Sequence, residues 1–225
     1  ELLFALLPYV ALALFFLVSI ARYRRRPFSV SSLSSQFLEN RQHFWGLVSF
    51  HYGLLTVLLG HLIAFLIPRS VLAWNSVPLR LYILEISGLT FGLLALIGII
   101  ISSLRRLNGP RLRVVSTPTD WVMILMVLVQ IVSGVWTAIF HGWGSSWFAA
   151  TATPYLWSIF TFQPEIALVT AMPFMVKLHI VTAFLIIGFF PFTRLVHALV
   201  MPLMYLNRKN QVVRWWRSPR ASGYR

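Results

Sequence analysis

Five long apolar runs decide what kind of protein this chain can form. A bilayer core about 30 Å thick is crossed by about 20 apolar residues in a helix. Runs of this length lie at Leu2–Ala21, Trp45–Ile67, Leu81–Ser103, Thr119–Phe140 and Pro173–Val200. Hydrophobic residues make up 58% of the chain and charged residues 11%, so little polar sequence remains to cover five buried helices. We predict an all-α polytopic membrane protein, a bundle of five transmembrane helices, which excludes a soluble enzyme.

Basic residues predict how this bundle is oriented. Of the 19 Lys and Arg residues, most fall in the first and third connecting segments and in the C-terminal tail, whereas the other side holds Arg69 and Arg80. Positive charge favours cytoplasmic loops, which places the N-terminus outside and the tail in the cytoplasm. The first run precedes its basic cluster, so we expect a retained helix and not a cleaved signal peptide. Residues 1–205 then form the membrane domain and residues 206–225 a basic cytoplasmic tail.

The charge and the aromatic residues each allow two interpretations. A net charge of +14 is typical of nucleic-acid-binding proteins, but here it lies in short clusters between apolar runs, so we expect no nucleic-acid partner. The segment from His141 to Met172 is rich in Trp, Phe and Tyr. Anchoring of these rings at the membrane interface is the simpler explanation, and a lid over a lipid-soluble substrate is the alternative.

The six histidines are the candidates for chemistry, because ionisable residues inside a membrane are costly. Four of them, His51, His61, His179 and His197, fall in the second and fifth runs, which cross the membrane in opposite directions. Counting from the helix ends predicts two pairs at matching depths. His51 and His197 lie near the cytoplasmic face, and His61 and His179 near the outer face.

Two facing neutral imidazoles are the axial ligands of a b-type haem, which needs no cysteine, and the chain has none. The spacings do not match: ten residues separate His51 from His61, and eighteen separate His179 from His197. Helix tilt and a kink at Pro191 must absorb the difference. A zinc or copper site would need three or four converging ligands. A proton relay would use carboxylates such as Glu85, and a lone buried histidine is often only a hydrogen-bonding residue.

Two cations lie close to these histidines. Lys177 precedes His179 by two residues and Arg194 precedes His197 by three. We predict that they bind haem propionates, with snorkelling to the lipid headgroups as the alternative. Four helix glycines allow either close approach of a macrocycle or close helix contact. They are Gly53, Gly60, Gly92 and Gly188.

Several short motifs resemble the gamma subunit of respiratory nitrate reductase, a diheme cytochrome b. They are Ser34–Leu38, Phe50–Gly53 with Gly60-His61, Lys177–His179, Phe190–His197 and the tail Tyr205–Arg214. The resemblance implies a multi-pass subunit of the prokaryotic cell membrane. It also implies a proximal haem on His51 and His197, and a distal haem on His61 and His179.

The resemblance further implies an activity and partners. Quinol or menaquinol would be oxidised near the distal haem, at a site with Gly60, His61 and, in place of the family's lysine, Arg80. Electrons would pass to an iron–sulfur subunit and then to a molybdenum-containing catalytic subunit, docked on the basic cytoplasmic surface. Lipid and quinone are the membrane partners.

Three alternatives stay open at this point. The first is a related quinone-linked cytochrome b of sulfur metabolism. The second is a relative that works in a nitrite-oxidising complex. The third is a haem-free membrane anchor or transporter in which the histidines are structural.

Overall fold

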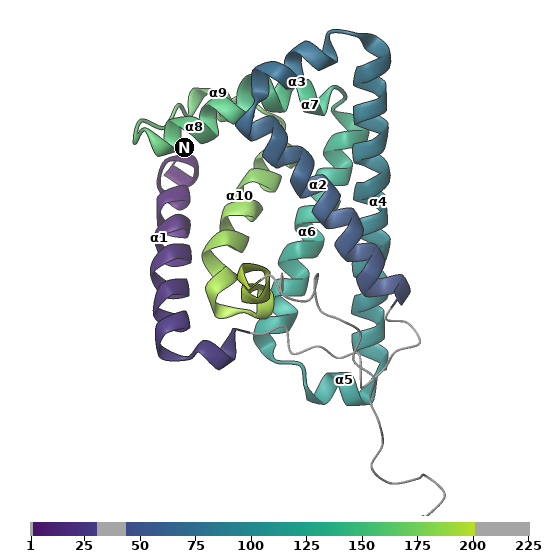
Figure 1. Cartoon of the computed structure of the whole chain (residues 1–225), viewed down its shortest axis with the longest axis vertical. Coiled ribbons are helices and arrows are strands. Elements are labelled where there is room, and N and C mark those ends of the chain that lie inside the picture. Colours follow the sequence, from purple (N-terminus) through teal and green to yellow (C-terminus); the bar gives the residue numbers. More distant parts are fainter. Residues whose placement is uncertain (1, 31–43, 201–225) are drawn as a thin grey trace, which may run out of the picture.

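The structure is a computed structural model that describes residues 2–30 and 44–200, and these residues form helices and turns without any strand (Figure 1). The long helices are α1 (Leu2–Arg25), α2 (Ser49–Leu66), α4 (Pro78–Asn108), α6 (Pro118–Phe140) and α10 (Phe174–Phe189). Five helical spans are long and apolar enough to cross a membrane, so the predicted fold class is confirmed. His43 and the predicted tail 206–225 lie outside the described residues.

Shorter helices join the long ones at both ends of the bundle. They are η1 (Pro27–Ser29), the π-helical turn η2 (Phe44–Val48), α3 (Pro68–Asn75), α5 (Pro110–Val114), α7 (Gly144–Trp147), the π-helical turn η3 (Phe148–Ala152), α8 (Thr153–Phe160), α9 (Ala167–Thr170), η4 (Phe190–Phe192) and η5 (Arg194–Leu199). A proline begins α3, α4, α5 and α6, where its missing N–H has no helical partner to lose. Prolines therefore mark these helix starts in the sequence.

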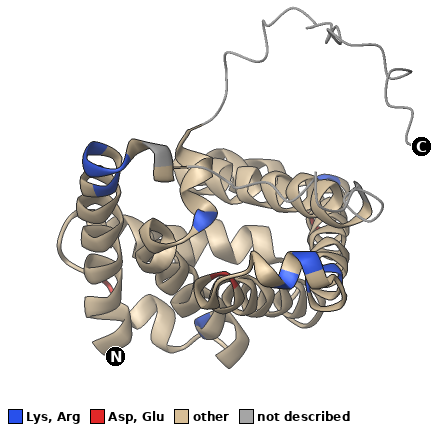
Figure 2. Cartoon of the chain, turned by 90° about the horizontal axis from the view of Figure 1, so that it is seen from below, with Lys and Arg blue, Asp and Glu red and all other residues tan. Residues whose placement is uncertain are grey.

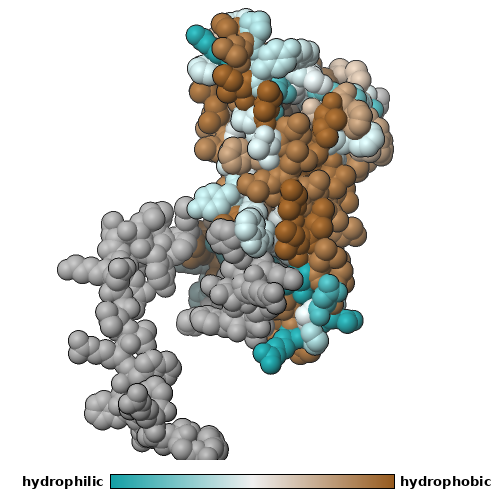
Figure 3. All heavy atoms as spheres, turned by 90° about the vertical axis from the view of Figure 1, so that its right-hand side faces the viewer, coloured by the Kyte–Doolittle hydropathy of each residue, from teal (hydrophilic) through white to brown (hydrophobic). Residues whose placement is uncertain are grey.

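The spans expose apolar side chains over most of their length. At most 28% of any of these hydrophobic windows is buried within the chain, and Leu17, Leu55 and Leu125 are 60–70% exposed. The apolar surface forms a broad region between more hydrophilic ends (Figure 3). Apolar side chains gain from this arrangement only if lipid replaces water around them, which agrees with a membrane-spanning bundle.

Small residues let the helices approach closely. A Cβ on Gly53 of α2 would lie 2.5 Å from the Phe91 carbonyl oxygen of α4, and one on Gly188 of α10 would lie 3.2 Å from Cα of Ala11 in α1. Both glycines therefore serve helix contact. Among the described residues, in contrast, a Cβ on Gly60 would have no heavy atom of a neighbouring segment within 4 Å, and one on Gly92 would make only an ordinary contact with Val135.

The two ends of the bundle differ in character. At one end, called the capped end here, α3, α7, η3, α8 and α9 lie across the long helices (Figure 1). Glu85 of α4 attaches this layer to the long helices, because its carboxylate accepts hydrogen bonds from the backbone N–H groups of Gly144 and Ser145. The opposite end, called the basic end, carries clustered arginines at the ends of α1 and α4 and in α5 (Figure 2).

The fifth run folds differently from the prediction of one long kinked helix. Helix α10 ends at Phe189, because Pro191 lacks the N–H that would continue the helix, and the chain turns through η4. Thr193 is extended, with φ −116° and ψ −177°, and η5 then starts a new direction with His197 on it. The eighteen residues from His179 to His197 are therefore not one continuous rise, which removes the mismatch with α2.

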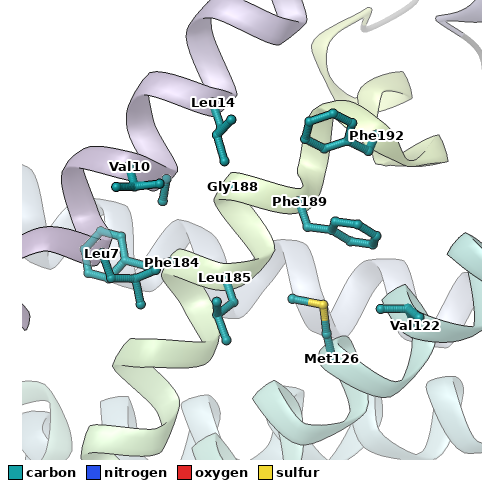
Figure 4. A pocket seen from close by; sticks show the side chains of 11 residues that line it. Leu7, Val10, Leu14, Val122, Met126, Phe184, Leu185, Gly188, Phe189 and Phe192 are labelled. Atoms are coloured by element: carbon teal, nitrogen blue, oxygen red, sulfur yellow. The ribbon is translucent and has the colours of Figure 1, made fainter. Parts of the chain in front are cut away.

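An apolar cavity of about 450 Å³ lies between α1, α6 and α10 (Figure 4). Its walls include Leu7 and Leu14 of α1, Met126 of α6, and Phe184 and Phe189 of α10. No histidine of the described part of the chain lines it, so this cavity is separate from the candidate site.

Candidate functional site

The four membrane histidines form two pairs, one toward each end of the bundle. At the basic end, the ring centres of His51 and His197 lie 6.4 Å apart with 65° between their planes. At the capped end, the rings of His61 and His179 lie 6.3 Å apart with 31° between their planes. Helix α2 crosses the bundle diagonally and supplies one member of each pair (Figure 1).

These separations match those of two ligands on one metal ion. Because a metal ion binds an imidazole nitrogen at about 2 Å and the ring centre lies about 1 Å farther out, two imidazoles on opposite sides of one ion have centres about 6 Å apart. Within residues 2–30 and 44–200, no group of three or more His, Asp or Glu side chains is placed to share a metal ion. The described part of the chain thus offers two-ligand sites, which suit a metal whose other ligands come from a macrocycle.

Hydrogen bonds at Nδ1 set the tautomer of three of the rings. Nδ1 of His51 lies 2.7 Å from the carbonyl oxygen of Leu47, and Nδ1 of His61 lies 2.9 Å from that of Val57. Nδ1 of His197 lies 2.6 Å from the carbonyl oxygen of Arg194. Since a carbonyl only accepts, each Nδ1 carries the proton and each Nε2 keeps a lone pair for a metal.

His179 is held by the neighbouring helix α6 instead of by its own helix. Its Nδ1 lies 3.0 Å from the carbonyl oxygen of Gln130 and 3.1 Å from Oγ of Ser133. Its Nε2 lies 3.0 Å from the side-chain nitrogen of Gln130, which donates to it. Gly134 faces the same ring, and a Cβ there would lie only 2.9 Å from Cε1 of His179. Three residues of α6 therefore hold this imidazole. Because the Gln130 amide uses the lone pair of Nε2, a metal on this ring would require that amide to turn away.

The cation predicted at the basic end has a carboxylate partner that the sequence analysis missed. Nε of Arg194 lies 3.1 Å from Oδ1 of Asp120, and its Nη2 donates to the carbonyl oxygen of Val115 at 2.8 Å. Asp120 is 9% exposed and forms a capping box with Thr117 at the start of α6. The motif Thr-Pro-x-Asp at residues 117–120 was a readable signal for this cap. Arg194 therefore has a counter-ion in the protein itself.

The other predicted site residues lie toward the capped end. Lys177, in the first turn of α10, donates from Nζ to the carbonyl oxygen of Thr170 at 3.2 Å. Gly60 and His61 are exposed, and the His61 ring contacts Phe148 edge-on with centres 5.1 Å apart. Arg80 lies in the first turn of α4, and its guanidinium carbon lies 5.2 Å from the ring centre of Trp74. Of these four residues, Gly60 and His61 lie on one local surface because they are adjacent on α2. Lys177 and Arg80 contact other residues.

Comparisons with known proteins place the whole chain among similar sequences. Residues 1–216 match the protein family described as nitrate reductase gamma subunit. The nitrate reductase gamma chain of Bacillus subtilis is 35% identical over 218 residues, which cover 95% of this chain and 97% of that one. The respiratory nitrate reductase 1 gamma chain of Escherichia coli is 30% identical, with 94% and 95% covered. The nitrate reductase-like protein NarX of Mycobacterium tuberculosis is also 30% identical, over 92% of this chain and 33% of its own.

Proposed function

The chain belongs to the nitrate reductase gamma subunit family, and on this premise we propose that each histidine pair holds one b-type haem. The chain is a membrane subunit of a nitrate reductase complex, an oxidoreductase with catalytic and other subunits as partners. The observation that carries the proposal is the pair of ring separations, 6.4 Å and 6.3 Å. The Nδ1 bonds to carbonyl oxygens support it, because they leave Nε2 of His51, His61 and His197 as acceptors.

The proposed function of the subunit is quinol oxidation near the capped end and delivery of electrons to an iron–sulfur subunit at the basic end. When bound, b-type haem supplies one-electron redox chemistry. The two histidine pairs of this chain would bind and orient the group. We propose that Lys177 binds a propionate, because within residues 2–30 and 44–200 no carboxylate lies at salt-bridge distance from it. Arg194 is the second cation that we propose as a propionate ligand, although it already pairs with the Asp120 carboxylate.

Replacement of single histidines tests the two haem sites. His51→Ala or His197→Ala should remove one haem and spare the other, and His61→Ala or His179→Ala should remove the second. The measurement is haem content per chain together with the dithionite-reduced b-type absorption band of the purified protein. His141→Ala is the matched control, since His141 ends α6 outside both pairs, and it should keep two haems. An unmodified chain without haem would disprove the proposal.

The proposed quinol site uses Gly60 and His61, with Arg80 as a further candidate. The free space around Gly60 supports this, because a larger side chain there would contact a bound quinol and not a neighbouring helix. Gly60→Val should therefore keep both haems but raise KM for menaquinol or slow its oxidation. Gly88→Val is the control, because a Cβ on Gly88 of α4 also meets no neighbouring segment within 4 Å. Equal quinol oxidation by both variants would place the quinol site elsewhere.

A further inference from the structure

The segment that carries His197 is attached to the bundle by polar contacts instead of helical continuity. Thr193 separates η4 from η5, and its Oγ1 accepts a hydrogen bond from the backbone N–H of Leu195 at 3.1 Å at the start of η5. Val196, 1% exposed, is an apolar anchor of this segment. Arg22 of α1 donates from Nη1 to the carbonyl oxygens of Pro191 at 2.6 Å and Thr193 at 2.9 Å. The position of His197 therefore depends on neighbouring helices.

Asp120 of α6 makes the other attachment, and its two oxygens have different tasks. Oδ2 accepts from the backbone N–H of Thr117 at 2.9 Å and lies 3.6 Å from the guanidinium of Arg106. Oδ1 lies 3.1 Å from Nε of Arg194. The contacts of Oδ2 thus hold the carboxylate in place, and Oδ1 is the oxygen that binds Arg194. A buried carboxylate in this setting is held far more rigidly than an exposed surface partner.

The chain of contacts continues from Asp120 to the imidazole. Arg194, fixed by Asp120 and by the carbonyl oxygen of Val115, contributes its own carbonyl oxygen to Nδ1 of His197 at 2.6 Å. A shift of the Arg194 backbone would therefore rotate or release the His197 ring. Such partners of a ligating histidine affect metal affinity by about 10–100-fold when they are removed.

We propose that Asp120 is a positioning residue that places His197, through Arg194, for the haem at the basic end. The inference rests on the proposed function, since it concerns the ligand of a proposed haem. It also gives Arg194 a second role besides binding a propionate. Helix α6 supplies no haem ligand by this account, yet it positions a ligand at each end, through Asp120 for His197 and through Gln130 and Ser133 for His179.

Asp120→Asn tests the proposal, because the amide keeps the size and the cap acceptor but removes the charge that holds Arg194. The full chain, purified with its haems, is examined by electron paramagnetic resonance and by redox titration of its absorption spectrum. We expect the affinity of the His51–His197 site for haem to fall by up to about tenfold, or the g values of this haem to change, because the Arg194 carbonyl oxygen that holds Nδ1 of His197 is no longer fixed. The His61–His179 haem should stay unchanged and thus reports that the bundle is folded.

Two further variants keep the test decisive. Ser116→Ala removes the hydrogen bond from Arg106 to Ser116 Oγ, 2.8 Å long, at the same corner without touching Arg194, and should leave both signals unchanged. If Asp120→Asn loses both haems, Arg194→Lys decides, because lysine keeps a cation for a propionate but lacks the planar guanidinium that bonds both Asp120 and the carbonyl oxygen of Val115. An unchanged His51–His197 signal in Asp120→Asn, or in Arg194→Lys where that variant decides, would overturn the inference. Absence of both haems from the unmodified chain would instead overturn the proposed function.

Discussion

His179 differs from the other three membrane histidines in what holds its ring. His51, His61 and His197 each bond a carbonyl oxygen three or four residues earlier in their own segment. His179 bonds Gln130 and Ser133 of α6, across a helix–helix contact. Its orientation therefore depends on how closely α6 approaches α10, and the absence of a side chain at Gly134 allows that approach.

Gly134→Ala should disturb the haem that we propose at the capped end. The added methyl group would lie 2.9 Å from Cε1 and 3.3 Å from Nδ1 of His179, so the ring must move and lose its bonds to α6. We expect haem content to fall from two toward one per chain, measured as pyridine haemochrome, with the remaining spectrum that of the His51–His197 haem. Gly88→Ala, in open space on α4, is the control and should keep both haems. Two unchanged haems in Gly134→Ala would contradict this role of Gly134.

At this scale the sequence predicts which histidines come together, but not the residues that hold their rings. Charged or ionisable residues in apolar runs stand out in a sequence, and helix direction is enough to compare their depths. Gln130 and Ser133 carry no such signal, because their role arises from contact between two helices far apart in the chain. Asp120 was recognisable only as a helix cap; its partnership with Arg194 depends on where η5 folds.

Among the elements, a buried phenol of α8 joins the capped end to α1. Tyr155 of α8 is 0% exposed, and its hydroxyl donates to the carbonyl oxygen of Phe4 at 2.8 Å. Its ring also meets that of Phe4 edge-on, with centres 6.4 Å apart. Burial, with a smaller contribution from Tyr9, raises the pKa of Tyr155 to about 12.

This raised pKa predicts a loss of stability in alkali. Unfolded tyrosine has a pKa of about 10, so below that pH both states hold the neutral phenol and its contribution is complete. Between about pH 10 and 12 the unfolded state loses its proton first, and stability falls as pH rises.

Thermal denaturation of the native chain and of Tyr155→Phe at about pH 9 and about pH 11 measures this effect. The variant should be less stable at the lower pH by about 1–3 kcal/mol, because the Phe4 carbonyl loses its donor. It should also lose less stability between the two pH values. The control Tyr23→Phe, at a side chain 62% exposed, should match the native chain. An equal loss of stability between the two pH values in all three proteins would refute the assignment of the raised pKa to Tyr155.

The elements themselves were predictable except where proline and a polar residue interrupt an apolar run. Hydrophobic length locates the first four spans to within a few residues of α1, α2, α4 and α6. The fifth run stays apolar past Pro191, so its composition could not reveal that α10 ends at Phe189. What decides the end is the missing proline N–H together with the hydrogen bonds that Arg22 offers to the turn.

For the whole molecule, the separation of charge between the ends is the feature with the most direct test. Arginines gather at the basic end, whereas Glu85 and the aromatic helices α7 and α8 belong to the capped end. Membrane insertion favours positive charge in the cytoplasm, so the basic end is predicted to face inward.

The absence of cysteine makes this orientation simple to measure. A single cysteine at Gly142, an exposed site at the capped end, should react with a membrane-impermeant maleimide added to spheroplasts. A single cysteine at Arg113, exposed at the basic end, should react only after the membrane is opened. Both variants should keep two haems, which shows that the reporters do not disturb the fold. The reverse labelling pattern would invert the predicted topology.

Helix α2 alone sets the spacing between the two histidine pairs. Its His51 and His61 lie on an uninterrupted stretch, and ten residues at the standard rise hold them about 15 Å apart along the axis. The facing segment uses eighteen residues, from His179 to His197, for the same step between the two pairs. It can do so because the chain leaves the helix after Phe189 and turns into η5. One residue inserted between His51 and His61 in α2 would rotate one of these histidines by about 100° about the helix axis relative to the other. An insertion in the turn after Phe189 would change the position of His197 much less, because that turn is not part of a continuous helix.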